Sequence, residues 1–218
     1  MKKTFLLSCL MLAAMPVMAA YTGHVYVDKN KNGVFDQSEK PLAGIKVSDG
    51  LNVVETAADG SFTLPGHERE RFIFITTPSG YKTFNRHYHK IEKKQSGYDF
   101  GLIPYSGRIR KDGSHRYIHI TDTEIFNTEN HADWVNNVRD YARNEQAAFT
   151  IHTGDICYEK GLKAHIKLMN TENMDCPVFY CIGNHDLVKG KYGEELFESI
   201  YGPVYYSFDA GNVHYVVT

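Results

Sequence analysis

The chain has 218 residues, 42% of them hydrophobic, which is enough to bury one good core or two small ones and too long for a single minimal domain. Its 24 Lys and Arg residues nearly balance 26 Asp and Glu residues, so the formal net charge of -2 provides no basic surface that would indicate a nucleic-acid-binding protein. Beyond the N-terminal segment, no apolar run is long enough to span a membrane.

Residues 1–20, MKKTFLLSCLMLAAMPVMAA, have the layout of a cleaved bacterial signal peptide: two lysines, an apolar run, a proline and small residues at the end. The run is too short for an anchor across a bilayer core of about 30 Å. A lipoprotein site at Cys9 is the other alternative, and it would need a longer apolar run before the cysteine. We therefore expect an exported protein, periplasmic or extracellular.

Residues 21–104 are predicted to form an all-β domain. Short β-type segments such as GHVYVD, AGIKVSD and RFIFITTPSGY are separated by turn residues, and none has the apolar period of a helix. This spacing is typical of a small β-sandwich. Residues 105–115 are rich in glycine and charge, which predicts a linker.

A loop in this front domain, residues 28–39 (DKNKNGVFDQSE), matches the EF-hand calcium-loop template. The candidate oxygen ligands, around the turn residue Gly33, are Asp28, Asn30, Asn32, Asp36 and Glu39. Its flanking segments are predicted to be strands, so the loop resembles the EF-hand-type loops of bacterial surface β-sandwich repeats and not a helix-loop-helix sensor. The alternative is an Asn- and Gly-rich hairpin that binds no metal.

Residues 116–218 alternate between strand and helix patterns. Strands are predicted at RYIHITD, AAFTIHTGD and PVFYCIGNHD, and helices at 130–146, KGLKAHIKLMNTE and GEELFESIYG. The first helix is expected to bury a face made of Trp134, Val138, Tyr141 and Ala142. Such alternation predicts parallel strands joined by right-handed crossovers, with ligands at the carboxyl ends of the strands.

All three predicted strands are followed by polar residues. These are Asp122 and Glu124, then Gly154 and Asp155, then Asn184, His185 and Asp186. Turn residues follow strands in most βα loops, so one such loop would mean little. Three together provide the carboxylate, amide and imidazole donors that divalent cations accept, which favours a metal site.

After signal-peptide cleavage three cysteines remain, Cys157, Cys176 and Cys181. An odd number excludes a complete disulfide framework. Residues 176 and 181 flank a predicted strand that would hold them too far apart to pair. We expect buried thiols.

The motifs ITDTE, HTGDICYEKG and CIGNHD resemble the first three motifs of the calcineurin-like metallophosphoesterases, and YGPVYYSFDAGNVHYVV resembles the strand pair that follows them. In the front half, ADGSFTLP and FITTPSGY resemble transthyretin-like or carboxypeptidase-regulatory-like domains, and the whole front half resembles the N-terminal domain of some exported bacterial calcineurin-like phosphoesterases. The resemblance implies an α/β protein: an all-β, transthyretin-like (prealbumin-like) sandwich, then the first βαβαβ part of the four-layer αββα metallophosphoesterase sandwich.

The resemblance also implies roles for the site residues. Asp122 would bind the first metal, Asp155 would bridge two metals, and Asn184 would bind the second. His185 would protonate the leaving oxygen or stabilise phosphoryl charge, and Asp186 would orient it. The family implies two divalent ions (Mn, Fe, Zn or Mg) and a bridging hydroxide that hydrolyses the phosphomonoester or phosphodiester bond of a small phosphorylated substrate.

Two departures from the family pattern stand out. Glu124 occupies the position of a usual histidine, where it is either a harder ligand that favours Mn²⁺, Mg²⁺ or Ca²⁺, or a surface residue. Nothing after His185 matches the family's later histidines, and His214 lies inside a strand pattern. We therefore expect residues 116–218 to be an incomplete phosphoesterase domain that stops in mid-strand at Thr218.

Two functions of different class remain. The leading hypothesis is an exported metal-dependent phosphoesterase with an accessory front domain. The alternative is an extracellular binding or adhesion module, stabilised by calcium, with a degenerate phosphoesterase half. A serine hydrolase is disfavoured because no G-x-S-x-G nucleophile elbow is present.

Overall fold

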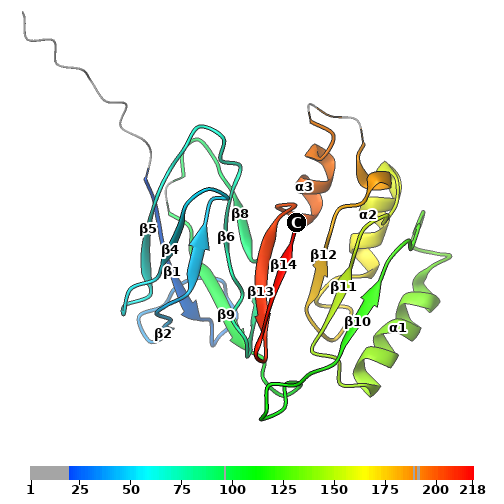
Figure 1. Ribbon diagram of the computed structural model, residues 1–218, viewed down its shortest axis with the longest axis horizontal. Helices are drawn as coiled ribbons and strands as arrows, with labels where there is room; N and C mark the ends of the chain where they lie inside the picture. The colour runs from blue at the N-terminus through cyan, green and yellow to red at the C-terminus, as the bar shows by residue number, and fades with distance from the viewer. Residues whose placement is uncertain (1–19, 96, 189, 191) are drawn as a thin grey trace, which may run out of the picture.

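The computed structural model describes residues 20–95, 97–188, 190 and 192–218, so the predicted signal peptide lies outside it except for Ala20, where the first strand begins. A strand-rich part and a βα part lie side by side (Figure 1). The predicted mixed α/β class is confirmed. No helix in the described ranges combines the length and the apolar character needed to cross a membrane.

The front part is built from two sheets. The first has five strands, in the order β2-β1-β9-β7 with β5 also paired to β1: β1 (Ala20–Val27), β2 (Lys40–Pro41), β5 (Ser61–Pro65), β7 (Tyr81–Thr83) and β9 (Phe100–Pro104). The second has the order β4-β3-β6-β8: β3 (Lys46–Ser48), β4 (Val53–Glu55), β6 (Phe72–Ile75) and β8 (Tyr88–Lys90). Both are antiparallel except for the β1–β9 pair.

Strand β6 explains how the front part joins the rest of the molecule. All four of its residues, FIFI, are buried, although a half-exposed strand would alternate. Ile73 and Ile75 pack in the core between the two front sheets. Phe72 and Phe74 point to the opposite face, into a second core shared with the βα part.

The βα part contains a parallel sheet in the order β10-β11-β12, namely β10 (Tyr117–Ile120), β11 (Phe149–His152) and β12 (Val178–Tyr180). Its helices are α1 (Ala132–Asn144), α2 (Glu159–Leu168), the 3₁₀ turn η1 (Asn184–Asp186) and α3 (Glu195–Tyr201). A hairpin follows, formed by β13 (Tyr206–Ala210) and β14 (Val213–Val217). The predicted strand and helix alternation is present, with helices shorter than expected.

The buried face of α1 differs from the prediction. Val135 and Ala142 are buried and Val138 packs beside them, whereas Trp134 is 41% exposed and Tyr141 58% exposed. The buried face of α1 is therefore formed by positions 135, 138 and 142, which lie on one side of a helix with 3.6 residues per turn. Val138 and Ala142 lie on the buried face as predicted, whereas the prediction was wrong for Trp134 and Tyr141, each of which precedes a buried position by one residue, or about 100° of rotation.

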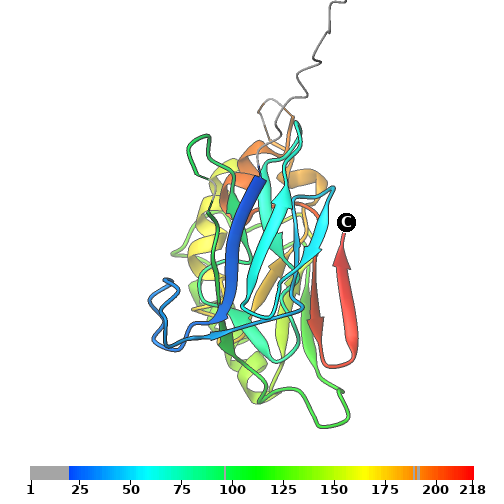
Figure 2. The same cartoon turned by 90° about the vertical axis from the view of Figure 1, so that its left-hand side faces the viewer.

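The hairpin β13–β14 lies between the front sheets and the parallel sheet (Figure 1), and the view onto the front domain shows it along one edge of the molecule (Figure 2). The ring of Phe208 on β13 stacks on Phe179 of β12 with centroids 3.6 Å apart. On the side of the hairpin that faces the front domain, the backbone N–H of Asp209 donates to the Thr77 carbonyl at 2.8 Å. The two parts thus share one apolar core, although the chain between them has the composition of a linker.

A partly buried ion pair also fastens the two parts. The guanidinium of Arg71, at the start of β6, donates to the Glu198 carboxylate of α3 at 2.6 and 3.1 Å. The Tyr192 hydroxyl donates to the same carboxylate at 2.9 Å, and Glu198 is only 3% exposed. We call this set of three residues the clasp.

The three cysteines of the described chain are free thiols. Cys157 and Cys176 are buried as expected, and Cys181 is half-buried.

Candidate metal centre

The three predicted site loops meet at one edge of the parallel sheet. In the register of this sheet, Ile120 lies beside His152, and His152 beside Tyr180, so all three strands end at the same level. The loops that follow carry Asp122, Asp155 and Asn184 to the carboxyl edge, as expected for a parallel sheet.

Three of the predicted acids have a left-handed backbone conformation. Their φ angles are 53° for Asp122, 44° for Glu124 and 52° for Asp155. A residue with a Cβ is strained in this region by about 1 kcal/mol or more. Residues with such backbone strain are often found at functional sites, and here they are the residues whose carboxylates are the candidate metal ligands.

Two glycines bring the second and third loops into contact. A Cβ on Gly154 would lie 2.7 Å from the Gly183 backbone, and a Cβ on Gly183 would lie 2.1 Å from the Asp155 nitrogen. Neither position therefore has room for a larger residue. The backbone N–H of His185 donates to the Asp155 carboxylate at 3.1 Å, which links the Gly-Asp turn to the Gly-Asn-His-Asp turn.

The imidazole of His185 lies between two side chains. Its ring stacks on Tyr158, with centroids 5.1 Å apart and 20° between planes. Its Nδ1 lies 3.5 Å from Glu124 Oε1, makes no hydrogen bond with the described residues, and is itself buried. Glu124 therefore faces the histidine of the third motif, and its own side chain is 46% exposed.

The Asp186 carboxylate is buried and holds two loops together. It accepts hydrogen bonds from the backbone N–H groups of Gly183 at 2.9 Å and Cys157 at 3.0 Å. Burial raises the pKa of Asp186, and the nearby Asp155 charge adds to this effect. Asp186 was expected to orient His185; the contacts found are with the backbone of Gly183 and Cys157, which hold the turn that carries His185.

His152, at the end of β11, is a site residue that sequence reasoning missed. Gly154 N–H donates to its Nδ1 at 3.3 Å, so its Nε2–H can donate to the Thr123 hydroxyl at 3.0 Å. Burial lowers the pKa of His152 to about 4, partly offset by the Asp122 and Asp155 charges. A neutral histidine thus ties the first loop to the second, and its place before Gly-Asp on a buried strand was the available signal.

Two protein-family models together match most of the chain. Residues 29–104 match the family described as N terminal of Calcineurin-like phosphoesterase, and residues 115–216 match Calcineurin-like phosphoesterase. The chain belongs to the calcineurin-like phosphoesterase family. No curated protein matches the chain.

Membership of the calcineurin-like phosphoesterase family implies metal-dependent hydrolysis of phosphoesters, and the residues at the sheet edge suit such ions. Asp122 and Asn184 are exposed, and Glu124 and Asp155 are half-buried, so their oxygens remain accessible. In the described chain, the carboxylates of residues 122, 124 and 155 do not all lie within 4.8 Å of one another. A pair of ions about 4 Å apart needs ligands spread over a wider site than one ion does.

A tighter cluster of potential ligands lies in the front domain, where Asp49, His67 and Glu70 have ligand atoms within 4.8 Å of one another. His67 Nδ1 accepts the Arg69 N–H at 3.1 Å, which leaves the proton on Nε2, 3.4 Å from the Asp49 carboxylate. Glu70 accepts from the Tyr21 hydroxyl. A metal ion would need a lone pair on Nε2 of His67, but in this arrangement Nε2 carries the proton. The residues therefore form a contact between a histidine and an aspartate.

The predicted calcium loop is closed by its own hydrogen bonds. Asp28 is 1% exposed and accepts from the backbone of Asn32 at 3.2 Å and Gly33 at 2.9 Å. Glu39 is 7% exposed and accepts the Asp36 N–H at 3.2 Å. The Asp36 carboxylate accepts from the amides of Asn30 at 2.7 Å and Asn32 at 3.0 Å. The loop joins β1 to β2, so its flanks are strands, as predicted.

Proposed function

We propose that this protein is an exported metal-dependent phosphoesterase that cleaves phosphomonoester or phosphodiester bonds of small phosphorylated substrates. The observation that carries the proposal is the contact between the Gly-Asp turn at Asp155 and the Gly-Asn-His-Asp turn at 183–186, beside the strained Asp122. Family membership supports it, because both turns belong to the matched region.

In this proposal Asp122, Asp155 and Asn184 hold the metal ions, with Asp155 placed between the other two loops. When bound there, two divalent cations would supply a hydroxide nucleophile and neutralise the phosphoryl oxygens. The left-handed backbone at Asp122 and Asp155 sets the direction in which each side chain leaves the main chain. Asp186 and His152 hold these turns against each other through the backbone and Thr123.

His185 is the proposed proton donor to the leaving oxygen. Its backbone is fixed by Asp155, and its ring is positioned by Tyr158. Because Nδ1 faces Glu124, the opposite nitrogen, Nε2, is the one left to face a substrate.

Glu124 is proposed as a metal ligand that makes the first site harder than the usual histidine would. A Glu124→His variant should then contain more Fe or Zn and less Mn after purification from the same cells, as measured by elemental analysis. Unchanged metal content would assign Glu124 only to its contact with His185.

The phosphoesterase proposal is tested by Mn²⁺-dependent hydrolysis of bis-p-nitrophenyl phosphate. We expect turnover that EDTA abolishes and that Asp155→Asn removes, with Asp140→Asn, an exposed site on α1, as the matched control. Absence of metal-dependent turnover in the wild-type protein would favour the alternative of a binding or adhesion module with a degenerate phosphoesterase half.

We further propose that the loop at residues 28–39 binds one Ca²⁺ that stabilises the front domain. The motif spacing and the burial of Asp28 and Glu39 support this. Ca²⁺ should raise the melting temperature, and Mg²⁺ at the same concentration should raise it less. A melting temperature that does not respond to Ca²⁺ would leave the loop as a hydrogen-bonded hairpin.

Export is proposed from the sequence of residues 1–20. Protein recovered from the periplasm or the medium of an expressing bacterium should begin at or near Tyr21 by N-terminal sequencing. Recovery of the uncleaved chain from the cytoplasm alone would contradict it.

A further inference from the structure

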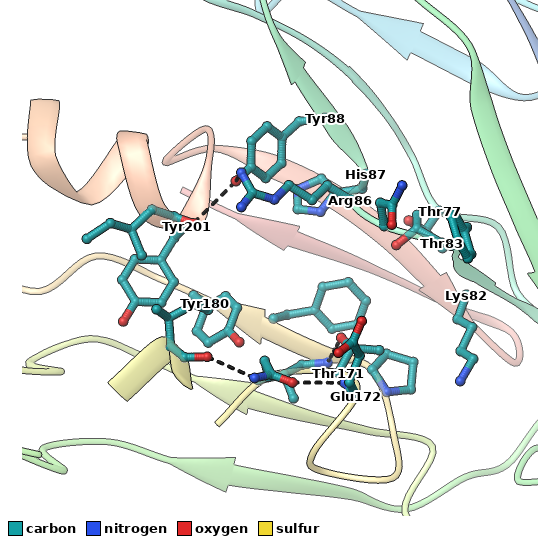
Figure 3. Close-up of a pocket in the computed structure, with 18 residues that line it drawn as sticks. Thr77, Lys82, Thr83, Arg86, His87, Tyr88, Thr171, Glu172, Tyr180 and Tyr201 are labelled. Atoms are coloured by element: carbon teal, nitrogen blue, oxygen red, sulfur yellow. Dashed lines mark hydrogen bonds between the residues drawn. The ribbon is translucent and has the colours of Figure 1, made fainter. Parts of the chain in front are cut away.

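A cavity of about 410 Å³ lies between the front domain and the βα part. Figure 3 shows Lys82, Arg86, His87 and Tyr88 on its front-domain side, with Tyr180 among the side chains across from them. None of the proposed metal-centre residues lines it. Its volume lies in the range of small-molecule sites, and it lies at a junction between two parts of a chain, where such sites are common.

Two residues that line this cavity each have a buried polar atom without a hydrogen-bond partner among the described residues. Thr77 is 4% exposed and its Oγ1 is buried without a hydrogen bond, although its carbonyl is held by Asp209. The Nε2 atom of His87 is likewise buried and unpaired. Buried polar groups are nearly always paired, so each of these two residues at the cavity wall has a hydrogen-bonding group left without a partner.

The cavity has an excess of positive charge. Neither Arg86 nor Lys82 forms an ion pair with a carboxylate in the described chain; Arg86 donates to the Tyr88 hydroxyl at 3.0 Å, and Lys82 lies over the ring of Tyr105. Burial, with a contribution from Arg86, lowers the pKa of His87 to about 3, so its ring is neutral at pH 7. The lining therefore includes one guanidinium, one ammonium and one carboxylate, that of Glu172, which leaves an excess of one positive charge beside the neutral Thr77 and His87.

The opposite wall is largely aromatic, with polar side chains such as Asn170 and Glu172 beside the rings. Phe179 and Tyr180 of β12 line it, together with Tyr201 at the end of α3. Aromatic faces of this kind suit a planar ring, while an arginine suits a phosphate or carboxylate.

We propose that this cavity binds a small aromatic anion, with its ring between the two parts of the chain and its phosphate or carboxylate at Arg86. In this proposal Thr77 and His87 supply hydrogen bonds to the ligand, and its ring covers the aromatic side chains of the opposite wall. The proposal is independent of phosphoester hydrolysis, because it uses no residue of the metal centre. An occupant that touches both parts would also stabilise their present arrangement by mass action.

Calorimetric titration in EDTA tests this with phenylphosphonate and benzoate as probes. We expect each to bind at least about ten-fold more tightly than its incomplete counterparts, benzyl alcohol and inorganic phosphate, since neither counterpart fills both parts of the site. Arg86→Gln should weaken binding of both probes about ten-fold or more. Thr77→Val should weaken it several-fold. Arg110→Gln, another exposed arginine, serves as the matched control and should leave affinity unchanged.

The melting temperature of each variant shows whether a loss of affinity is caused by unfolding. Because Arg86 is exposed, its replacement should not unfold the protein. Equal affinity of wild-type protein and both cavity variants would overturn the proposal. So would binding that requires Mn²⁺ and disappears in Asp155→Asn, since the anion would then occupy the metal centre. Failure of both probes to bind at millimolar concentration would also reject it.

Discussion

The two proposed metal sites of this molecule are built in opposite ways. The calcium loop draws all its candidate ligands from twelve consecutive residues, 28–39, and its hydrogen bonds close within that stretch. The metal centre draws its ligands from three loops spread between Asp122 and Asn184. A local site can be recognised from spacing alone, whereas an assembled site depends on strand register, close glycine contacts and buried supports.

The largest expected effect separates the two sites directly. Asp155→Asn should lower Mn²⁺-dependent hydrolysis at least about 100-fold, because it removes the proposed bridging charge, and should leave the calcium response intact. Glu39→Gln should do the reverse: hydrolysis persists, while the stabilisation by calcium, about 2.7 kcal/mol at a hundred times the Kd, is lost. Kinetic assays and thermal melts of both variants measure this, and loss of both properties in either variant would contradict independent sites.

Disrupting the close contact between Gly183 and Asp155 should affect the assembled metal centre and not the calcium loop. Gly183→Ala would place a Cβ 2.3 Å from Asp155 Oδ1, so the two turns must separate. We expect a loss of about 3 kcal/mol in unfolding free energy, together with loss of hydrolysis. Gly107→Ala is the control, because a Cβ there meets nothing within 4 Å. Normal activity in Gly183→Ala, measured beside denaturant unfolding, would show that the turns tolerate separation.

The clasp should connect the front domain to the assembled site. Arg71→Gln leaves the buried Glu198 without its cation, and we expect a loss of about 2 kcal/mol, at the lower end for such pairs because Arg71 is itself 38% exposed. The exposed Lys46–Glu55 pair is the matched comparison, and Lys46→Gln should have no measurable effect. Urea unfolding decides between them; equal effects would show that the clasp is an ordinary surface pair.

The smallest expected effect is a pH slope from the residues beneath the metal centre. Burial, with a contribution from His152, holds the pKa of His165 well below its ordinary value of about 6.5. The unfolded chain therefore takes up a proton below pH 6.5 that the folded chain refuses, so stability is fully present above this pH and falls as pH drops. His165→Leu should reduce the slope of unfolding free energy by up to about 1.4 kcal/mol per pH unit. Identical slopes for wild type and variant between pH 6.5 and 5 would contradict this assignment.

The sequence predicted most of the fold because its patterns are local. Strand alternation, turn residues and the change to strand and helix repeats at residue 116 indicated both parts, and the flanks of the calcium loop were placed correctly between strands. Part of the inner face of α1 was misplaced because large aromatic residues such as Trp134 were given more weight than the smaller residues on the buried face.

Other features depend on the three-dimensional arrangement of the chain and could not be predicted from the sequence. Asp186 was expected to orient His185, but that its carboxylate accepts hydrogen bonds from the backbone of two loops could not be predicted from the sequence. The contact between Glu124 and His185 spans sixty-one residues of sequence and follows from strand order, not spacing. The shared core around Phe208 and Phe72 could not be predicted, since composition alone indicated a linker between two separate domains.

The most direct test of the assembled site is the position of bound Mn²⁺, found by anomalous X-ray diffraction from crystals grown with the ion. Our account predicts density bounded by Asp122, Asp155 and Asn184, lost in Asp155→Asn crystals grown in the same way. Density elsewhere, for example at Asp49, His67 and Glu70, with none at the sheet edge, would contradict it.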